Sequence, residues 1–367
     1  MNNKHNTENL FFELLKAGLW EQECRIDSLC EADIDDVYRM SEEQSVLGLV
    51  TAGLDRVKDI KVPKEWMLQF IGTTLQIEQR NKEMNHFIGI LIKRLQENNI
   101  YALLVKGQGI AQCYERPLWR SCGDVDLYLS GDNYQKAKDF LWRYAIVIEE
   151  ENLQRKHIAM NVDSFIVELH GTMHTSLSSK ICSGLDEVHD SIFKEGSVKS
   201  WRNGEVDVFL PSVDNNIIII FTHFITHFYI GGLGLRQVCD WCRLLWKHGN
   251  EINLSMLEER IVKMGLMEEW KGFASLAVEY LGMPKERMPF YSNKKKYCKK
   301  AQRIVRLILE AGNFGQNKDL SYHAKLPKGV RPIETFFRRF SEFARLATIF
   351  PGNAPKFFFN YVGSRLK

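Results

Sequence analysis

The stretch WRSCGDVDLYL, Trp119 to Leu129, places two aspartates inside a run that otherwise has the composition of a β-strand. Aspartate is depleted in strands, and an unpaired carboxylate is costly to bury. Side chains two residues apart share a strand face, so Asp124 and Asp126 point one way while the apolar residues between and after them point to a hydrophobic layer. Two such carboxylates repel each other unless a cation lies between them, which favours a divalent ion such as Mg²⁺.

A second strand-like segment, Phe165 to His170, carries a third carboxylate. Glu168 and His170 share one face of it. Glu168 either points to solvent from an edge strand or completes a two-metal site beside the aspartates, and three acids on strands favour the second interpretation. We therefore expect Asp124, Asp126 and Glu168 to be catalytic and to hold two Mg²⁺ ions. His170 contacts a ligand or the acceptor, or it is a structural histidine.

Residues ahead of the aspartates have the chemistry of a phosphate site. Lys106 and Gly107 follow an apolar strand at 101–105 and open a helix, where free amides favour phosphate. Arg120 can donate two N–H groups to a phosphate, and Gly123 permits close approach of the backbone. The alternatives are a surface lysine at a turn for Lys106 and an ion pair with a nearby acid for Arg120.

The composition is that of an ordinary soluble globular protein. The 367 residues are 45% hydrophobic and 26% charged, with a formal net charge of +3, and nothing here requires nucleic acid. The N-terminus lacks the pattern of a secretory signal. The most apolar stretch, 217–230, is short and interrupted by His223 and His227, so we expect a buried helix, no membrane contact and a cytoplasmic location. The eight scattered cysteines are expected to be reduced.

Hydrophobic periodicity divides the chain into three parts. Helical patterns at 8–17, 41–54 and 63–96 predict an N-terminal helical region, residues 1–97. Strand patterns at 101–105, 125–129 and 165–170, a helix at 134–144 and a hairpin at 197–210 predict an α/β core, residues 98–211. The dipeptide Asn203-Gly204 is typical of a type I′ turn in that hairpin. Helical patterns return in a C-terminal domain, residues 212–367, so the fold class is α+β.

Several polar residues of the C-terminal part lie at helical spacing. His223 and His227 share a helix face, and without a third ligand nearby they are expected to line the core or support a site rather than bind metal. Arg236 and Asp240 have the same spacing and are expected to pair, with Arg236 facing the cleft as the alternative. Three further groups are assigned structural roles: the lone Cys239/Cys242 pair, the lysines at 294–300 as a solvated helix face, and the aromatic residues at 357–361 as packing.

Four segments together are fairly specific: LLVKG (103–107), YERPLWRSCGDVDLYL (114–129), VELH (167–170) and HFITHFYIGGLGLRQVCDW (223–241). In this order they resemble the bacterial uncharacterised nucleotidyltransferase family of the DNA polymerase β-type nucleotidyltransferase superfamily. The resemblance implies a polymerase β-like core, a small mixed sheet with helices, in which Asp124 and Asp126 hold the metal ions and Glu168 is the third carboxylate. Two departures are the replacement of the superfamily's usual G-S by Lys106-Gly107-Gln108 and the longer gap between Gly107 and Asp124.

The resemblance implies Mg²⁺-dependent transfer of a nucleoside monophosphate from an NTP to a hydroxyl or phosphate acceptor. The acceptor is open: a small molecule, a protein side chain or an RNA end, with the near-neutral charge disfavouring a long nucleic acid. One alternative is a D-x-D glycosyltransferase, but such enzymes place a Rossmann-like half before the motif, whereas this chain is helical there. The other is a catalytically silent nucleotide-binding or regulatory module, against which the presence of all three acids argues. The sequence leaves the oligomeric state open.

Overall fold

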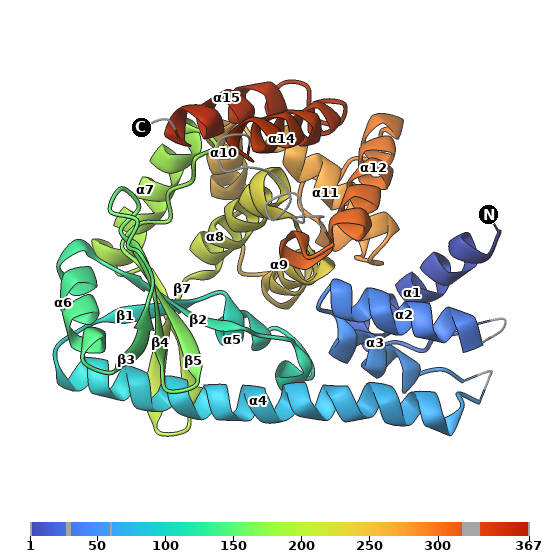
Figure 1. Cartoon of the computed structure of the whole chain (residues 1–367), viewed down its shortest axis with the longest axis horizontal. Helices are drawn as coiled ribbons and strands as arrows, with labels where there is room; N and C mark the ends of the chain where they lie inside the picture. Colours follow the sequence, from blue (N-terminus) through green and yellow to red (C-terminus); the bar gives the residue numbers. More distant parts are fainter. Residues whose placement is uncertain (1, 27–30, 59–60, 318–330, 366–367) are drawn as a thin grey trace.

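The computed structural model describes residues 2–26, 31–58, 61–317 and 331–365. A mixed β-sheet lies on one side of the molecule, a long helix runs beneath it, and helical regions from the two ends of the chain complete the structure (Figure 1). This arrangement confirms the predicted α+β class, with a mixed sheet flanked by N-terminal and C-terminal helices.

The sheet has seven strands in the order β3-β4-β5-β2-β1-β7-β6. The strands are β1 (Ala102–Val105), β2 (Asp124–Leu129), β3 (Ala145–Ile148), β4 (His157–Val162), β5 (Phe165–His170), β6 (Val198–Asn203) and β7 (Val206–Pro211). Central strand β2 is parallel to β5 and antiparallel to β1, β1 is parallel to β7, and the remaining neighbours are antiparallel. The motif strand thus lies in the middle of the sheet, where its backbone is paired on both sides.

Helices cover both faces of the sheet. On one face, Val125, Leu127 and Leu129 of β2 are buried against α4 (Lys64–Glu97) and α6 (Gly131–Trp142), as the alternation of the strand predicts. On the other face, Tyr128 is buried in a second core that includes α7 (Ser179–Phe193) and α8 (Val213–Thr226). The aspartates of β2 therefore point toward the side of the sheet on which the C-terminal helices lie.

Four helices form the N-terminal region: α1 (Asn2–Trp20), α2 (Glu31–Glu43), α3 (Leu47–Leu54) and α4. The 34 residues of α4 give it a length of about 51 Å, so it reaches from α3, where Thr74 bonds Thr51, to the sheet. The prediction of one helix over 41–54 is wrong. Ser45 adopts a left-handed φ of 55°, which ends α2 and lets α3 begin in a new direction.

The core contains elements that the sequence patterns missed. Strands β3 and β4, helix α7 and the 3₁₀ turn η1 (Pro117–Trp119) were not predicted, and α5 (Gly107–Ala111) is shorter than expected. The predicted hairpin is confirmed, but its turn is not of type I′. Asn203 pairs with Val206, so the turn residues are Gly204 and Glu205, and of the two only Gly204 has a positive φ, 62°.

The C-terminal region consists of the helices α8, α9 (Leu235–His248), α10 (Leu254–Met264), α11 (Met267–Glu279), α12 (Lys295–Ala311), α14 (Arg331–Ala347) and α15 (Ala354–Arg365), with short turns η2 (His227–Gly231, a π-helical turn), η3 (Lys285–Arg287) and η4 (Asn313–Gly315). Helix α8 is buried, as predicted for residues 217–230. Within the described ranges, no helix has both the length and the apolar character needed to cross a membrane.

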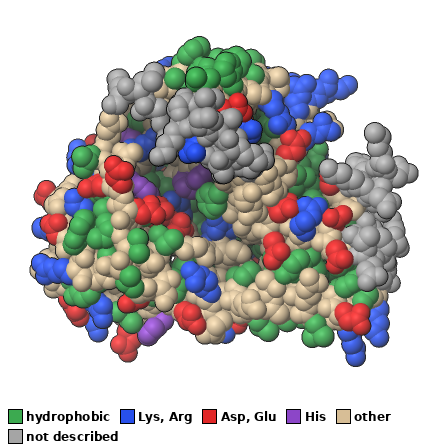
Figure 2. All heavy atoms as spheres, in the orientation of Figure 1, with side chains coloured by type: hydrophobic (Ala, Val, Ile, Leu, Met, Phe, Trp, Pro, Cys, Tyr) green, Lys and Arg blue, Asp and Glu red, His purple; other side chains and the backbone are tan. Residues whose placement is uncertain are grey.

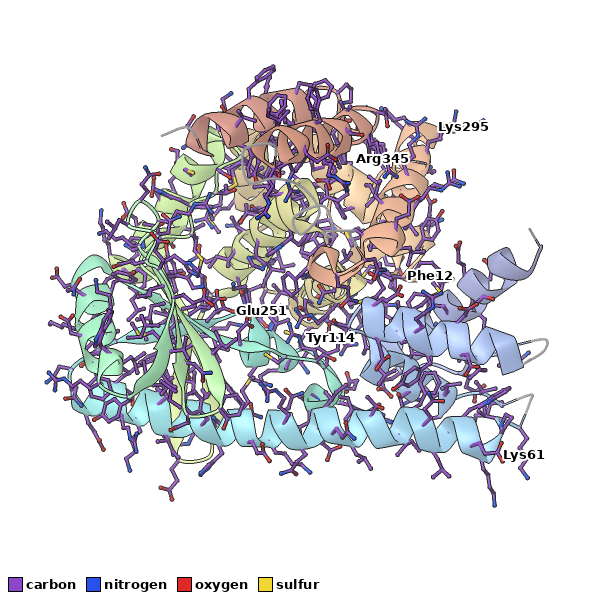
Figure 3. All side chains as sticks on the ribbon, in the orientation of Figure 1. Phe12, Lys61, Tyr114, Glu251, Lys295 and Arg345 are labelled. Carbon is purple, nitrogen blue, oxygen red and sulfur yellow. The ribbon has the colours of Figure 1, made fainter. Side chains whose placement is uncertain are left out.

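Three structural assignments from the sequence can be compared with their surroundings. Lys295 points away from the end of α12, and most of the neighbouring lysines are exposed, which confirms a solvated helix face (Figure 3). In α15, Phe357 and Phe358 are buried, whereas Phe359 is 72% exposed and does not pack in the core. Cys113, Cys122, Cys182, Cys298 and the buried Cys239 and Cys242 are free cysteines, and Cys30 lies outside the described residues.

Candidate functional site

A pocket of about 640 Å³, its solvent mouth included, lies between the sheet and helices α8 and α9. This volume is within the range of small-molecule sites. On the face shown in Figure 2, acidic, basic and histidine side chains gather around the hollow between the sheet and the C-terminal helices. The pocket is lined by Lys106, Gly107, Arg120, Asp124, Asp126, Glu168, Ile220, His223, His227, Arg236, Gln237, Asp240 and Phe314.

The sheet brings the three predicted carboxylates to this pocket. Asp124 and Asp126 lie on the same face of β2, and Glu168 of β5 is the register partner of Asp126. Asp126 is 2% exposed. The carboxylate of Asp124 makes no hydrogen bond or ion pair with any described residue, and repulsion from Asp126, together with burial, raises its pKa to about 6. A pair of neighbouring acids, one buried and the other half-buried and unpaired, is an arrangement that a cation stabilises.

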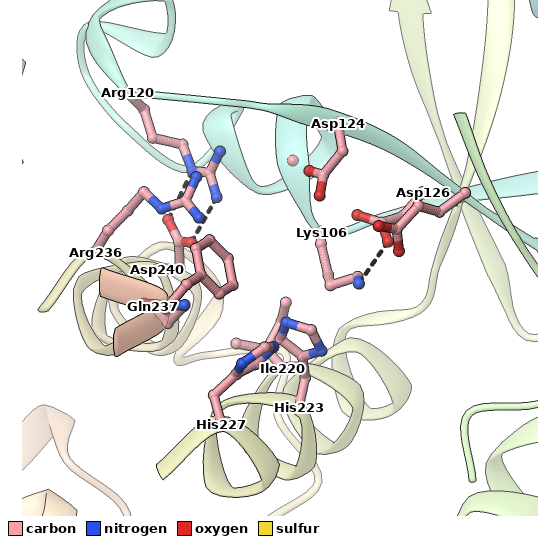
Figure 4. Close-up of a pocket in the computed structure, with 13 residues that line it drawn as sticks. Lys106, Arg120, Asp124, Asp126, Ile220, His223, His227, Arg236, Gln237 and Asp240 are labelled. Atoms are coloured by element: carbon pink, nitrogen blue, oxygen red, sulfur yellow. Dashed lines mark hydrogen bonds and ion pairs between the residues drawn. The ribbon is translucent and has the colours of Figure 1, made fainter. Parts of the chain in front are cut away.

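Lys106 provides a positive charge at this pair. Its Nζ lies 2.5 Å from Oδ1 of Asp126, as Figure 4 shows. Burial opposes the charge of the lysine, but the carboxylates of Asp126, Glu168 and Asp124 outweigh burial and raise its pKa above the ordinary value. Lys106 has a φ of 58°, an unfavourable conformation for a residue with a Cβ, which the structure holds at the end of β1.

Gly107 continues this unusual backbone with a φ of 40°. A Cβ at Gly107 would lie 3.2 Å from Sγ of Cys122, so both conformation and space favour glycine. Gly123 differs, because a Cβ there would meet no atom within 4 Å. Its lack of a side chain is therefore not required by the packing of this chain, and Gly123 is exposed beside the pocket.

Glu168 is held by two imidazoles. Nε2 of His157 lies 3.1 Å and Nε2 of His170 lies 3.4 Å from Oε2 of Glu168, while His170 also lies 2.8 Å from Oδ1 of Asp126. Burial opposes ionisation of Glu168, but the hydrogen bonds from both histidines lower its pKa well below the ordinary value. The prediction that His170 faces the carboxylate side fits this geometry. His157 was missed because it lies on β4, a strand that no sequence pattern indicated.

The residues present fit a divalent cation. Asp124 offers an unpaired carboxylate, Asp126 a neighbouring buried one, and Glu168 a third on the adjacent strand. Within the described residues, however, the group of three potential ligands whose donor atoms lie within 4.8 Å of one another is His157, Glu168 and His170. The three acids are thus brought to one pocket, whereas the tightest cluster is formed by one of them with the two imidazoles.

Arg120 is committed to an ion pair with Asp240. Its Nε lies 2.8 Å from Oδ1 and its Nη2 lies 2.6 Å from Oδ2 of Asp240, and both side chains are almost completely buried. Tyr114, in the interior beside α5 (Figure 3), donates a third hydrogen bond to the same carboxylate. This geometry matches the ion-pair alternative for Arg120. It contradicts the predicted pairing of Asp240 with Arg236, because Asp240 is already bound on both oxygens.

Arg236 instead faces the pocket, as the alternative interpretation held. It donates from Nη1 to the carbonyl of Ser121 at 2.7 Å, and its Nε has no partner among the described residues. In Figure 4 its guanidinium lies opposite Lys106, on the other side of Asp124. Of the two arginines, Arg236 is therefore the one with hydrogen-bonding capacity left for an anion.

A buried polar network fixes the segments that carry the site. Asn81 of α4 donates to the carbonyls of Leu118 and Arg120, and its own oxygen accepts from Gln108. One side chain thus connects the turn after β1 with the segment that leads into β2. Because both segments approach the pocket, α4 positions them although it contributes no lining residue of its own.

The opposite wall of the pocket carries neutral histidines. His223 and His227 project from α8 and η2 toward the pocket (Figure 4). Burial, then the charge of Lys106, lowers the pKa of His223 well below its ordinary value and that of His227 to about 4. The ring of His227 contacts Phe314, at 5.1 Å between centroids. No third potential metal ligand joins these two histidines in the described part of the chain.

A family model described as "Uncharacterised nucleotidyltransferase" matches residues 30–282. The chain belongs to this nucleotidyltransferase family. The match covers α2 to α4, the sheet and the first helices of the C-terminal region, and therefore every residue of the pocket except Phe314. No curated protein and no solved structure matches the chain significantly. The family assignment identifies a transferase class without naming a donor or an acceptor.

Proposed function

We propose that this nucleotidyltransferase-family protein transfers a nucleoside monophosphate from an NTP to a hydroxyl or phosphate acceptor and releases pyrophosphate. The observation that carries the proposal is the Asp124–Asp126 pair on one strand face, in which Asp126 is buried and Asp124 is half-buried and unpaired among the described residues. Without a cation such a pair of carboxylates is unfavourable. With Mg²⁺ bound, the pair would provide a binding site for phosphate groups.

Asp124, Asp126 and Glu168 would hold two Mg²⁺ ions. When bound, these ions would neutralise negative charge at the attacking and leaving oxygens. Lys106 and Arg236 lie on either side of Asp124 and neutralise the remaining charge of the triphosphate (Figure 4). Arg120 is not assigned to the triphosphate, because Asp240 occupies its guanidinium. The amide of Gly107, whose missing side chain leaves room, is the backbone donor on this wall.

In the reaction the acceptor oxygen bonds to the α-phosphorus, the bond from that phosphorus to the β-phosphate oxygen breaks, and the acceptor proton passes to solvent water. Glu168 is a poor proton acceptor, since hydrogen bonds from His157 and His170 hold its pKa low. We therefore assign Glu168 to cation binding and charge stabilisation. His157 and His170 keep it ionised and oriented.

The wall formed by Ile220, His223, His227 and Phe314 is assigned to the acceptor. Neutral imidazoles can donate and accept hydrogen bonds without repelling a cation site, and they suit a hydroxyl better than a second polyanion. A small molecule, a protein side chain or an RNA end can each present such a hydroxyl, and the proposal covers this class.

The test uses Asp126→Asn together with Asp163→Asn, an exposed aspartate in the turn between β4 and β5 whose φ of 54° asparagine tolerates. With α-phosphate-labelled NTPs and an acceptor pool, Asp126→Asn should lose transfer by about a hundredfold or more, and Mg²⁺ affinity should fall. Asp163→Asn should match the unaltered protein. Undiminished transfer and Mg²⁺ binding in Asp126→Asn would overturn the proposal.

A binding screen with NTPs and nucleoside diphosphate sugars, each with Mg²⁺, separates the two rival functions. Binding of nucleoside diphosphate sugars in place of NTPs would favour the D-x-D glycosyltransferase, although the described chain before β2 contains only β1 and no Rossmann-like half. Failure to bind any NTP with Mg²⁺ would favour a catalytically silent module. The family assignment and the retained acids support the nucleotidyltransferase over both.

A further inference from the structure

We propose that His157, Glu168 and His170 form a second metal site, selective for a late first-row transition ion such as Co²⁺, Ni²⁺ or Zn²⁺ over Mg²⁺. The site borders the nucleotide pocket, since Glu168 lines both. This second site is a proposal separate from nucleotidyl transfer, because metal binding to it can be measured without any nucleotide.

The sheet register assembles this cluster. His157 of β4 pairs with His170 of β5, and Glu168 stands two residues before His170 on the same face. The two imidazole rings lie side by side, with centroids 4.7 Å apart and planes inclined by 36°. Adjacent paired strands in the interior of a sheet have fixed positions, so the three donor groups are held together by backbone hydrogen bonds rather than by a loop.

The distances between donor atoms suit a bound ion. Nε2 of His157 and Nε2 of His170 lie 3.1 Å and 3.4 Å from the same oxygen of Glu168, and the three donor atoms lie within 4.8 Å of one another. Ligands about 2.1 Å from a tetrahedral or octahedral ion lie roughly 3.0–3.4 Å from each other. An ion can therefore replace the shared protons with little movement of the side chains.

The donor set determines which ions are preferred. Imidazole nitrogen suits late first-row ions such as Co²⁺, Ni²⁺ and Zn²⁺, whereas Mg²⁺ prefers oxygen ligands alone. The site also has access and a further ligand. The side chain of His157 is 36% exposed, so water can reach the ion, and Oδ1 of Asp126 lies 2.8 Å from Nε2 of His170. An ion held here would thus be adjacent to the aspartate pair without using Asp124.

The experiment titrates the full-length, metal-free protein with Co²⁺, without nucleotide, and follows the visible absorption of the ion and the heat of binding. His157→Ala removes one ligand, and His157→Gln removes it while keeping a hydrogen bond to Glu168. The matched control is His174→Ala, which removes a histidine that bonds a carboxylate, Asp186, outside the cluster. Asp124→Asn tests whether the aspartate pair contributes.

We expect Co²⁺ to bind the unaltered protein, and both His157 variants to bind it at least about tenfold more weakly. His174→Ala and Asp124→Asn should retain the absorption of nitrogen-bound Co²⁺. Absence of Co²⁺ binding in the folded, unaltered protein, or equal binding in the His157 variants, would overturn the second site and leave nucleotidyl transfer untouched. Conversely, loss of nucleotidyl transfer as a function would leave the Co²⁺ result standing.

Discussion

Replacing Arg120 distinguishes a buried ion pair from a phosphate ligand. Arg120→Met keeps an apolar stem of similar length but leaves Asp240 as a buried carboxylate with only the hydroxyl of Tyr114 as partner. The side chains of Arg120 and Asp240 are 4% and 5% exposed, so solvent cannot replace the lost guanidinium. We therefore expect the main effect of the substitution on stability.

The magnitude follows from the burial of the pair. Removing one partner of a buried ion pair costs about 3–5 kcal/mol in free energy of unfolding. For cooperative unfolding of 367 residues, an unfolding entropy of about 2.1 cal/mol/K per residue gives about 0.77 kcal/mol/K. The melting temperature should then fall by about 4–7 °C. Adding Asp240→Asn to Arg120→Met removes the uncompensated charge, so the double variant should be more stable than additivity predicts.

Thermal unfolding by circular dichroism measures these differences, and calorimetric titration measures NTP binding in the same samples. The matched control is Arg202→Met, since Arg202 is 60% exposed and pairs with the 56% exposed Asp207. That surface pair should contribute less than about 1 kcal/mol. An unchanged melting temperature in Arg120→Met, combined with weaker NTP binding, would refute the structural role and restore Arg120 as a phosphate ligand.

Three further predictions concern the pocket. Arg236→Ala should weaken NTP binding, measured by calorimetric titration, by about tenfold. Its melting temperature should change little, since the variant loses a single hydrogen bond, to Ser121. An unchanged dissociation constant for NTP would contradict the assignment of Arg236 to the triphosphate. The pKa of Asp124 is about 6, and its proton must leave before a cation binds. Mg²⁺ affinity should therefore rise about fivefold from pH 5 to pH 6, reach about tenfold by pH 7 and level off above it, and a flat titration profile would contradict this. In the metal-free protein the sign is reversed: the raised pKa of Asp124 contributes stability that is complete below its ordinary value of 3.8 and is lost as the pH rises through about 6. Gly107→Ala should cost about 1–3 kcal/mol in thermal unfolding because of its φ of 40° and the nearby Cys122, whereas Gly123→Ala, with open space at its Cβ, should melt like the unaltered protein.

The fold was predictable where one strand face is buried and the pattern is strong. The alternation in β2 predicted which residues enter the core, and Val125, Leu127 and Leu129 are buried there. Strand β4 was missed because its burial does not follow a clean alternation: Ile158, Ala159 and Met160 are all buried in succession. A short run of that kind gives no periodic signal that separates a strand from a loop or helix.

The sequence predicted those features of the pocket that depend only on the type of a residue and its position along a strand. Paired acids on one strand predict a common face whatever lies opposite, and the structure places Asp124, Asp126 and Glu168 at one pocket. The partner of a charged residue is different, because tertiary contacts decide it. The spacing of Arg236 and Asp240 favoured a local pair, but Asp240 bonds Arg120, 120 positions earlier in the chain. This contact depends on how α9 packs beside α5 and the segment before β2.

The ion pair between Arg120 and Asp240 also explains which charged side chains of the pocket remain available to a ligand. Arg120 and Asp240 neutralise each other in the interior, so they hold α9 against the segment before β2 without adding net charge to the pocket. This position of α9 brings Arg236 to the pocket, where its guanidinium bonds the neighbouring Ser121 carbonyl. The ion pair therefore stabilises the wall, while Lys106 and Arg236 face the three acids. In the proposed function, Asp126 would hold a cation in place of the ammonium group of Lys106, and that group would then be available to a phosphate.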